Sequence, residues 1–156
     1  MTERDTSRLI AWNNELRGVH NRLREALEVA RASLGTGGAV PTVSSDLFVY
    51  CRGFCVALGQ HHRGEDRSLF PAIEAAHPEL APVLRNLEQD HSMIDSLTDE
   101  LEAVVQRSAS PAEVKRHLEG ISAIMESHFA YEERQLLTVL ETLALSAEPE
   151  AVLGRI

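Results

Sequence analysis

Apolar residues recur at alternating steps of three and four positions in four stretches of the chain. The four stretches cover residues 9–34, 47–69, 80–105 and 114–143. This spacing is the period of a helix that is buried along one side. No stretch alternates apolar and polar residues with a period of two, so the sequence predicts no β-sheet. The pattern predicts an all-α protein folded as an up-down-up-down four-helix bundle.

Segments that do not favour helix separate the four stretches. A glycine-rich segment at residues 35–38 divides the first two, and the pair His77–Pro78 divides the next two. Before the last stretch, Ser110 is expected to cap the helix, with Pro111 in its first turn. Pro71 falls inside the second stretch, where it is expected to kink or end the helix because proline lacks an N–H.

The composition fits one globular core. The chain has 156 residues, of which 44% are hydrophobic and 25% are charged, and this predicts a single domain over residues 1–156. The helical core is expected to cover about residues 9–143, with a loosely held tail after Leu145. With 15 basic and 24 acidic residues the formal charge is -9, which disfavours binding to nucleic acids or anionic membranes.

The sequence also carries no obvious targeting or membrane signal. The start, MTERDTSRL, is charged and lacks the apolar core of a signal peptide. No apolar run approaches the roughly 20 residues that span a bilayer. A cytoplasmic protein is therefore expected.

Each of the four apolar stripes is interrupted near its middle by residues that can carry charge. Residues four apart on a helix project from the same face, so a histidine and a glutamate at this spacing point together into the bundle. Burying such groups without partners is costly, so something must compensate them. The interrupting residues are His20, His61 with Glu65, His91, and His128 with Glu132.

These residues belong to an internal repeat. The segment HHRGEDRSLF at residues 61–70 aligns with HFAYEERQLL at residues 128–137, and one further histidine precedes each copy. If the two copies fold against each other, they place two similar sets of side chains face to face around a pseudo-two-fold axis. The repeat makes a chance arrangement of these histidines and glutamates improbable.

A site that binds two metal ions would compensate the six buried groups. Imidazole suits iron, copper, zinc and nickel, whereas carboxylates suit harder ions and can bridge two of them. Such paired ions lie ~3.5–4 Å apart, and in the ferric state an oxide or hydroxide bridge would absorb part of their charge. The ligand count leaves a coordination position open to a small molecule. The alternative is a hydrogen-bonded polar network that holds no metal.

The segments HHRGEDRSLFP, EQDHSMIDSL and SHFAYEERQLL resemble the hemerythrin-like, or HHE cation-binding, domain over about residues 9–143. The chain is similar to the actinobacterial, mycobacterial-type members. The resemblance implies a non-heme di-iron centre with two iron ions joined by oxo or hydroxo and carboxylate bridges. Oxygen-carrying hemerythrins use five histidines and an unequal site, so this chain is expected to have a more symmetric, carboxylate-rich one. The implied ligands are His20, His61, Glu65, His91, His128 and Glu132.

The resemblance favours an enzyme that reacts with hydrogen peroxide. The expected reaction is a catalase-like disproportionation in defence against oxidative stress, in which the irons carry the redox change. One alternative is a module that binds or senses oxygen or nitric oxide. Another is an iron storage or donor protein. The oligomeric state cannot be derived from the sequence.

Residues near the six candidate ligands have two interpretations. Tyr131 follows His128 by three positions, so its hydroxyl could lie beside the metal as a second-sphere group or could simply pack in the core. His62, Asp66 and Glu133 flank the ligands and either orient an imidazole or form a solvated flank.

The remaining histidines and the cysteines are not expected to join the site. His77 and His117 are expected at the surface. Cys51 and Cys55 lie four apart on a predicted helix, whose backbone does not favour a disulfide, and are expected to be buried thiols.

Overall fold

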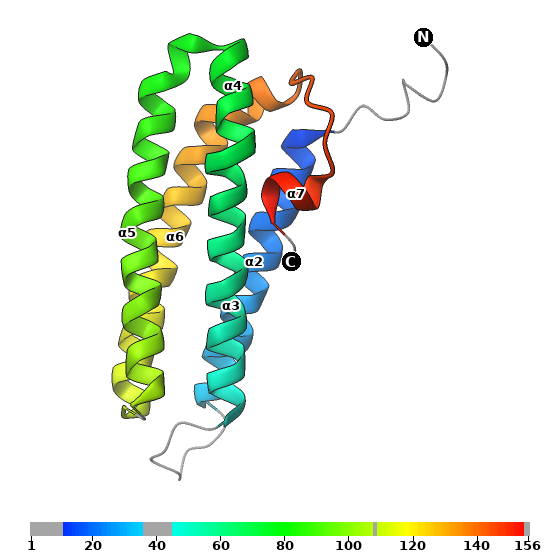
Figure 1. Ribbon diagram of the computed structural model, residues 1–156. Coiled ribbons are helices and arrows are strands. Elements are labelled where there is room, and N and C mark those ends of the chain that lie inside the picture. The colour runs from blue at the N-terminus through cyan, green and yellow to red at the C-terminus, as the bar shows by residue number, and fades with distance from the viewer. Residues whose placement is uncertain (1–10, 36–44, 108, 155–156) are drawn as a thin grey trace.

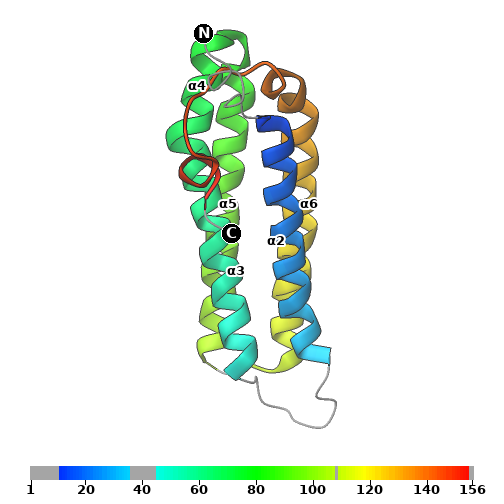
Figure 2. The same cartoon turned by 90° about the vertical axis from the view of Figure 1, so that its right-hand side faces the viewer.

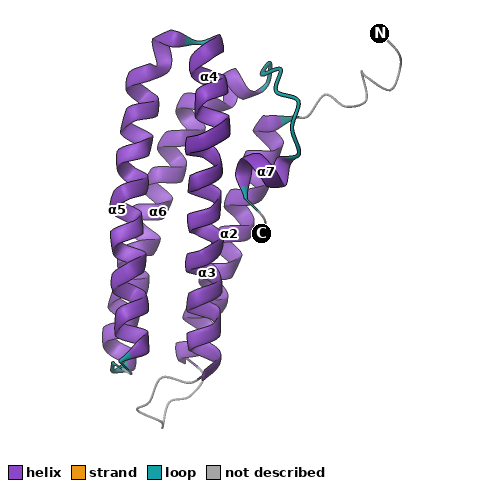
Figure 3. Ribbon diagram, viewed as in Figure 1, coloured by secondary structure: helices purple, strands orange, loops and turns teal. Residues whose placement is uncertain are grey.

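The structure of the protein is a computed structural model that describes residues 11–35, 45–107 and 109–154. Its long helices are α2 (Trp12–Gly35), α3 (Ser45–Gly64), α5 (Ala81–Gln106) and α6 (Pro111–Leu140). They lie side by side with alternating direction, as Figures 1 and 2 show. The described residues contain no strand (Figure 3). The predicted all-α bundle is therefore confirmed.

The bundle consists of two helical hairpins. We call α2 and α3, together with the helical turn that continues α3 over residues 65–69, the first hairpin, and α5 and α6 the second. The segment at residues 36–44 that joins the helices of the first hairpin lies outside the described residues, as does the expected helix start at residue 9. Ser110 caps α6, since its side chain accepts a hydrogen bond from the Glu113 backbone N–H at 3.3 Å, and Pro111 begins the helix as predicted.

Pro71 does not end the second helical stretch. Instead α3 passes into a π-helical turn, η1 (Glu65–Leu69), and then into α4 (Phe70–Ala76). The Phe70 N–H bonds to the Glu65 carbonyl five residues back, so the backbone widens just before the proline that cannot donate. A short 3-10 turn, η2 (Pro78–Leu80), then leads into α5. The π turn therefore begins at a candidate ligand.

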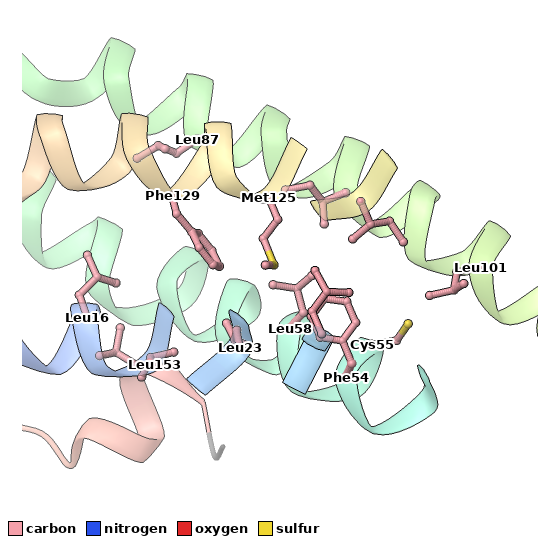
Figure 4. Close-up of a cluster of buried hydrophobic side chains, with 14 of the residues drawn as sticks. Leu16, Leu23, Phe54, Cys55, Leu58, Leu87, Leu101, Met125, Phe129 and Leu153 are labelled. Atoms are coloured by element: carbon pink, nitrogen blue, oxygen red, sulfur yellow. The ribbon is translucent and has the colours of Figure 1, made fainter. Parts of the chain in front are cut away.

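Buried apolar side chains from all four long helices fill the bundle. Figure 4 shows Leu23 of α2, Leu58 of α3 and Met125 of α6 meeting in this core. Cys51 and Cys55 are free thiols within it, which confirms their apolar role. Burial raises the pKa of Cys51 to about 11 and that of Cys55 to about 12.

The tail after Leu145 packs on the bundle, so the expectation of a loosely held tail is wrong. The Trp12 indole N–H donates to the Leu145 carbonyl at 3.1 Å, and the chain then forms α7 (Pro149–Leu153). Figure 1 shows this short helix beside α2 and α3. Val152 and Leu153 are both buried, and this apolar pair explains why the tail docks.

Two glycines permit the close approach of this tail. A Cβ atom on Gly64, at the end of α3, would lie 2.3 Å from the Val152 carbonyl oxygen. Gly154 ends α7 at φ 89°, a left-handed conformation that favours glycine, and a Cβ there would lie 2.8 Å from the His61 backbone N. The tail backbone therefore rests directly against the helix that carries His61.

Candidate metal centre

The six residues singled out by the sequence meet in the interior of the bundle. Each is only 0–2% exposed. They come from every long helix because each helix turns its apolar stripe, with the polar interruption in it, toward the bundle axis. The six are His20 on α2, His61 on α3, Glu65 at the start of η1, His91 on α5, and His128 and Glu132 on α6.

Each glutamate lies between one histidine of either hairpin. Glu132 Oε1 is 3.2 Å from His20 Nε2, and Glu132 Oε2 is 3.4 Å from His128 Nε2. Glu65 Oε1 is 3.3 Å from His61 Nε2 and 3.4 Å from His91 Nε2. The two contact patterns are related by the pseudo-two-fold symmetry of the repeat.

The donor atoms form two groups, each compact enough to hold a metal ion. Within each group the potential ligand atoms lie within 4.8 Å of one another. Each group takes two histidines from one hairpin and a glutamate from the other, and one of them includes a further histidine, His62. The groups are His20, His61 and Glu132, and His62, Glu65, His91 and His128.

Outer carboxylates contact the Nδ1 atoms of three of these histidines. An imidazole that donates from Nδ1 presents Nε2 as the free acceptor, so these contacts aim Nε2 at the centre. The carboxylates come from residues next to the candidate ligands in sequence. The contacts are His91 Nδ1 to Asp66 Oδ1 at 2.8 Å, His128 Nδ1 to Asp90 Oδ2 at 3.1 Å, and His20 Nδ1 to Glu133 Oε1 at 3.5 Å.

The fourth histidine, His61, has a different outer partner. Its Nδ1 lies 2.8 Å from the carbonyl oxygen of Leu153 in α7. In the second hairpin the corresponding acceptor is Asp90, which directly precedes His91. The equivalent position in the first hairpin is Val19, which directly precedes His20 and has no side-chain acceptor. The C-terminal tail thus supplies the acceptor that the first hairpin lacks.

His62 is a site residue that the spacing argument did not select. Its side chain is 1% exposed, and both ring nitrogens lack a hydrogen-bond partner. The signal in the sequence was its alignment with an apolar residue, Phe129, in the repeat, which indicates a buried position. Asp90 was also missed, because its partner lies on a different helix and no spacing within one helix reveals it.

The aligned pair His62 and Phe129 performs the same packing role in the two halves. Phe129 stacks on His20, with ring centroids 3.8 Å apart and planes 7° from parallel. His62 stacks on His91 at 3.9 Å and 10°. Each hairpin thus covers one imidazole of the other hairpin with a flat ring.

Tyr131, His77 and His117, which the sequence analysis also considered, lie outside the two metal-capable groups. The Tyr131 hydroxyl accepts a hydrogen bond from Asn86 at 3.4 Å, and Asn86 is not a candidate ligand. Both line a surface pocket of about 430 Å³ that Asp90 also borders. His77 is partly exposed and pairs with Glu79, and His117 is partly buried on α6. Neither histidine belongs to a metal-capable group among the described residues.

The buried histidines and glutamates shift one another's pKa values. Burial and the neighbouring negative charge of Glu132 raise the pKa of Glu65 well above its usual range. Burial alone would raise the pKa of Glu132 as well, but hydrogen bonds from Glu65, His128 and His20 lower it well below. Burial and the nearby His20 lower the pKa of His61 to about 3. Burial alone would also lower the pKa of His20 and of His128, but the hydrogen bond and the charge of Glu132 raise both above the usual value. The glutamates therefore supply the negative charge at the centre, as a cation site requires.

The donor set fits iron. Among the described residues, the buried side-chain nitrogen and oxygen atoms that lack a hydrogen-bond partner belong to His20, His61, His62, Glu65 and Glu132. Unpartnered buried polar atoms are costly, and a coordinated cation would satisfy most of these at once. Nitrogen and carboxylate oxygen donors without sulfur suit iron and similar first-row ions.

Comparison with known proteins agrees with this geometry. The family model described as hemerythrin HHE cation binding domain matches residues 13–140. No curated protein and no solved structure matches the chain. No helix in the described ranges is long and apolar enough to cross a membrane. Domains of this family bind metal ions, typically iron, and their site implies a small-molecule ligand. With most of its length matched and its buried histidines and glutamates in two metal-capable groups, the chain belongs to the hemerythrin HHE cation-binding family.

Proposed function

We propose that the centre holds two iron ions, one in each group, and that Glu65 and Glu132 bridge them. The observation that carries the proposal is the position of these carboxylates. Each lies 3.2–3.4 Å from the Nε2 atoms of two histidines that belong to different groups. A carboxylate placed between two nitrogen pairs in this way is suited to bridge two cations.

The proposed reaction is the disproportionation of hydrogen peroxide to water and oxygen. Bound iron would supply the redox chemistry. Carboxylate ligands stabilise the ferric state, and the outer carboxylates add negative charge around the centre. This charge favours oxidative chemistry over reversible oxygen carriage, which depends on an accessible ferrous state.

The chain's own residues would orient the imidazoles, exclude bulk water and move protons. Stacked rings cover the centre, and the six candidate ligands are almost fully buried. The outer carboxylates reach solvent, because Asp66 is 36% exposed, Asp90 34% and Glu133 22%. Each carboxylate can therefore exchange the Nδ1 proton of its imidazole with solvent, which would adjust how strongly Nε2 donates to a bound metal.

The experiment is metal analysis and spectroscopy of the purified protein, followed by addition of peroxide to the same sample. Two irons per chain, charge-transfer bands in the near ultraviolet and sustained oxygen evolution would support the proposal. The Glu132→Gln variant should lose iron and oxygen evolution together. Glu119→Gln, at an exposed position on the same helix, is the matched control and should retain both.

Other outcomes would contradict the proposal in different ways. Two irons with a reversible spectral change on adding oxygen or nitric oxide, and no peroxide turnover, would indicate a binding module. Rapid loss of iron to a chelator without turnover would indicate storage or donation. A folded protein that takes up no metal would mean that the histidines and glutamates form a polar network.

A further inference from the structure

His62 is the buried polar residue at the centre whose role the ligand set does not explain. It lies within 4.8 Å of the ligand atoms of Glu65, His91 and His128. Neither of its ring nitrogens has a hydrogen-bond partner. An imidazole always carries at least one N–H, so a donor is buried here with nothing to receive it. A group of this kind needs a functional explanation.

Geometry argues against His62 as a metal ligand. A metal ion bound to an imidazole lies in the plane of the ring, on the lone-pair axis of the nitrogen. The rings of His62 and His91 stack 3.9 Å apart and only 10° from parallel, so their planes do not meet at a common ion. If His91 binds the metal, His62 in this orientation does not.

The outer contacts lead to the same conclusion. Three of the candidate ligand histidines, His61, His91 and His128, hydrogen-bond an acceptor through Nδ1, which fixes the direction of Nε2. The fourth, His20, has a carboxylate oxygen 3.5 Å from its Nδ1. His62 has no such acceptor on either nitrogen. It therefore lacks the support that the ligand histidines share.

The repeat identifies what this position does. His62 aligns with Phe129, and the two rings cover His91 and His20 with nearly the same stacking geometry. The residues that directly follow His61 and His128 therefore form walls of the centre rather than bind metal. One wall is a hydrocarbon ring, and the other is a ring that can donate a hydrogen bond.

We propose that His62 donates a hydrogen bond to a small exogenous ligand with an accepting terminal atom, such as azide or peroxide, bound on the His91 side of the centre. The Phe129 wall offers no donor on the His20 side. The two metal positions thus have similar protein ligands but differ toward small molecules. This inference rests on the metal-binding part of the proposed function and does not depend on peroxide turnover.

The test uses sodium azide with the iron-loaded, oxidised protein and the His62→Phe variant, which makes the two walls alike. We expect two irons per chain and an unchanged spectrum before azide is added. Azide affinity should fall about fivefold to tenfold, the effect of one hydrogen bond. The azide stretching frequency should shift between H2O and D2O in the parent protein but not in the variant. His117→Phe, on α6 outside both groups, is the control and should behave as the parent.

A second pair of variants removes dependence on the phenylalanine being accommodated. His62→Leu and His62→Gln differ mainly in whether an N–H donor remains. Azide affinity should fall in the leucine variant and stay within about twofold of the parent in the glutamine variant. Equal affinity in the two variants would overturn the proposal.

Two further results would also overturn it. If His62→Phe or His62→Leu bound only one iron, or changed the spectrum in the absence of azide, His62 would be a metal ligand. If azide binding and the solvent isotope shift stayed at parent values with both irons present, His62 would be a packing residue only. Failure of the parent protein to bind iron would instead refute the proposed function itself.

Discussion

Replacing Gly64 with alanine tests whether the C-terminal tail is docked on the metal centre. Gly64 has ordinary helical backbone angles, φ -61° and ψ -44°, so alanine suits its conformation. On helix propensity alone the change should stabilise the protein by about 0.5–1 kcal/mol. The new Cβ, however, would lie 2.3 Å from the Val152 carbonyl oxygen, and a backbone atom cannot rotate away as a side chain can.

The size of the effect follows from comparison with a second glycine on the same helix. Gly53 has nothing within 4 Å of an added Cβ, so Gly53→Ala should show the propensity gain alone. Overpacking against a close-packed neighbour costs about 1–3 kcal/mol. The free energy of unfolding of Gly64→Ala should therefore lie about 1–3 kcal/mol below that of Gly53→Ala, measured by urea denaturation of the metal-free proteins.

The same substitution should also weaken metal binding. Displacing α7 removes the Leu153 carbonyl from His61 Nδ1, and loss of such an outer partner lowers metal affinity about 10- to 100-fold. Competition with a chelator would measure this, with Gly53→Ala as the unaffected control. If the two alanine variants unfolded alike and bound iron alike, the tail would not be docked as described and the reasoning would be refuted.

Three further predictions concern the ligands, their outer partners and the thiols. Either His61→Ala or Glu132→Ala should abolish binding of two irons, by metal analysis, and a variant that kept both irons would show that the ligand assignment is wrong. Asp90→Asn should lower iron affinity about 10- to 100-fold in chelator competition, because the amide is a weaker acceptor for His128 Nδ1 than the carboxylate. Unchanged affinity would show that Asp90 does not support the site. With pKa values of about 11 and about 12, Cys51 and Cys55 have thiolate fractions of ~0.001 and ~0.0001 at pH 8. A chromogenic disulfide reagent should leave both thiols unmodified in the native protein at pH 8 and label both in denaturant. The rate of labelling should rise about tenfold for each pH unit above 8. Rapid labelling of the native protein would show that the thiols are exposed.

The sequence predicted the bundle and the six buried residues for a definite physical reason. Helical periodicity identifies the side that each helix buries, and a histidine or glutamate on that side must be partnered. The repeat then showed that the polar interruptions recur in both hairpins. Their meeting in two groups followed from the antiparallel packing of the hairpins.

Other features of the site depend on contacts between distant segments, which periodicity does not encode. Asp90 reaches His128 across the interface between α5 and α6. The five-residue helix α7 is too short to show a helical period, so the docking of Leu153 on His61 could not be derived. His62 is next to the candidate ligand His61 in sequence, and the sequence left open whether it orients an imidazole or forms a solvated flank. The wide apolar side of α3 buries it.

The exchange of carboxylates between hairpins has a consequence for the folding kinetics. Each metal-capable group joins two histidines of one hairpin to the glutamate of the other, so neither hairpin alone contains a complete group. Metal can be fully coordinated only after the hairpins have docked, which is a late event if docking limits the folding rate. Iron should then leave the folding rate nearly unchanged but lower the unfolding rate, so the metal would stabilise the native bundle mainly by slowing its unfolding.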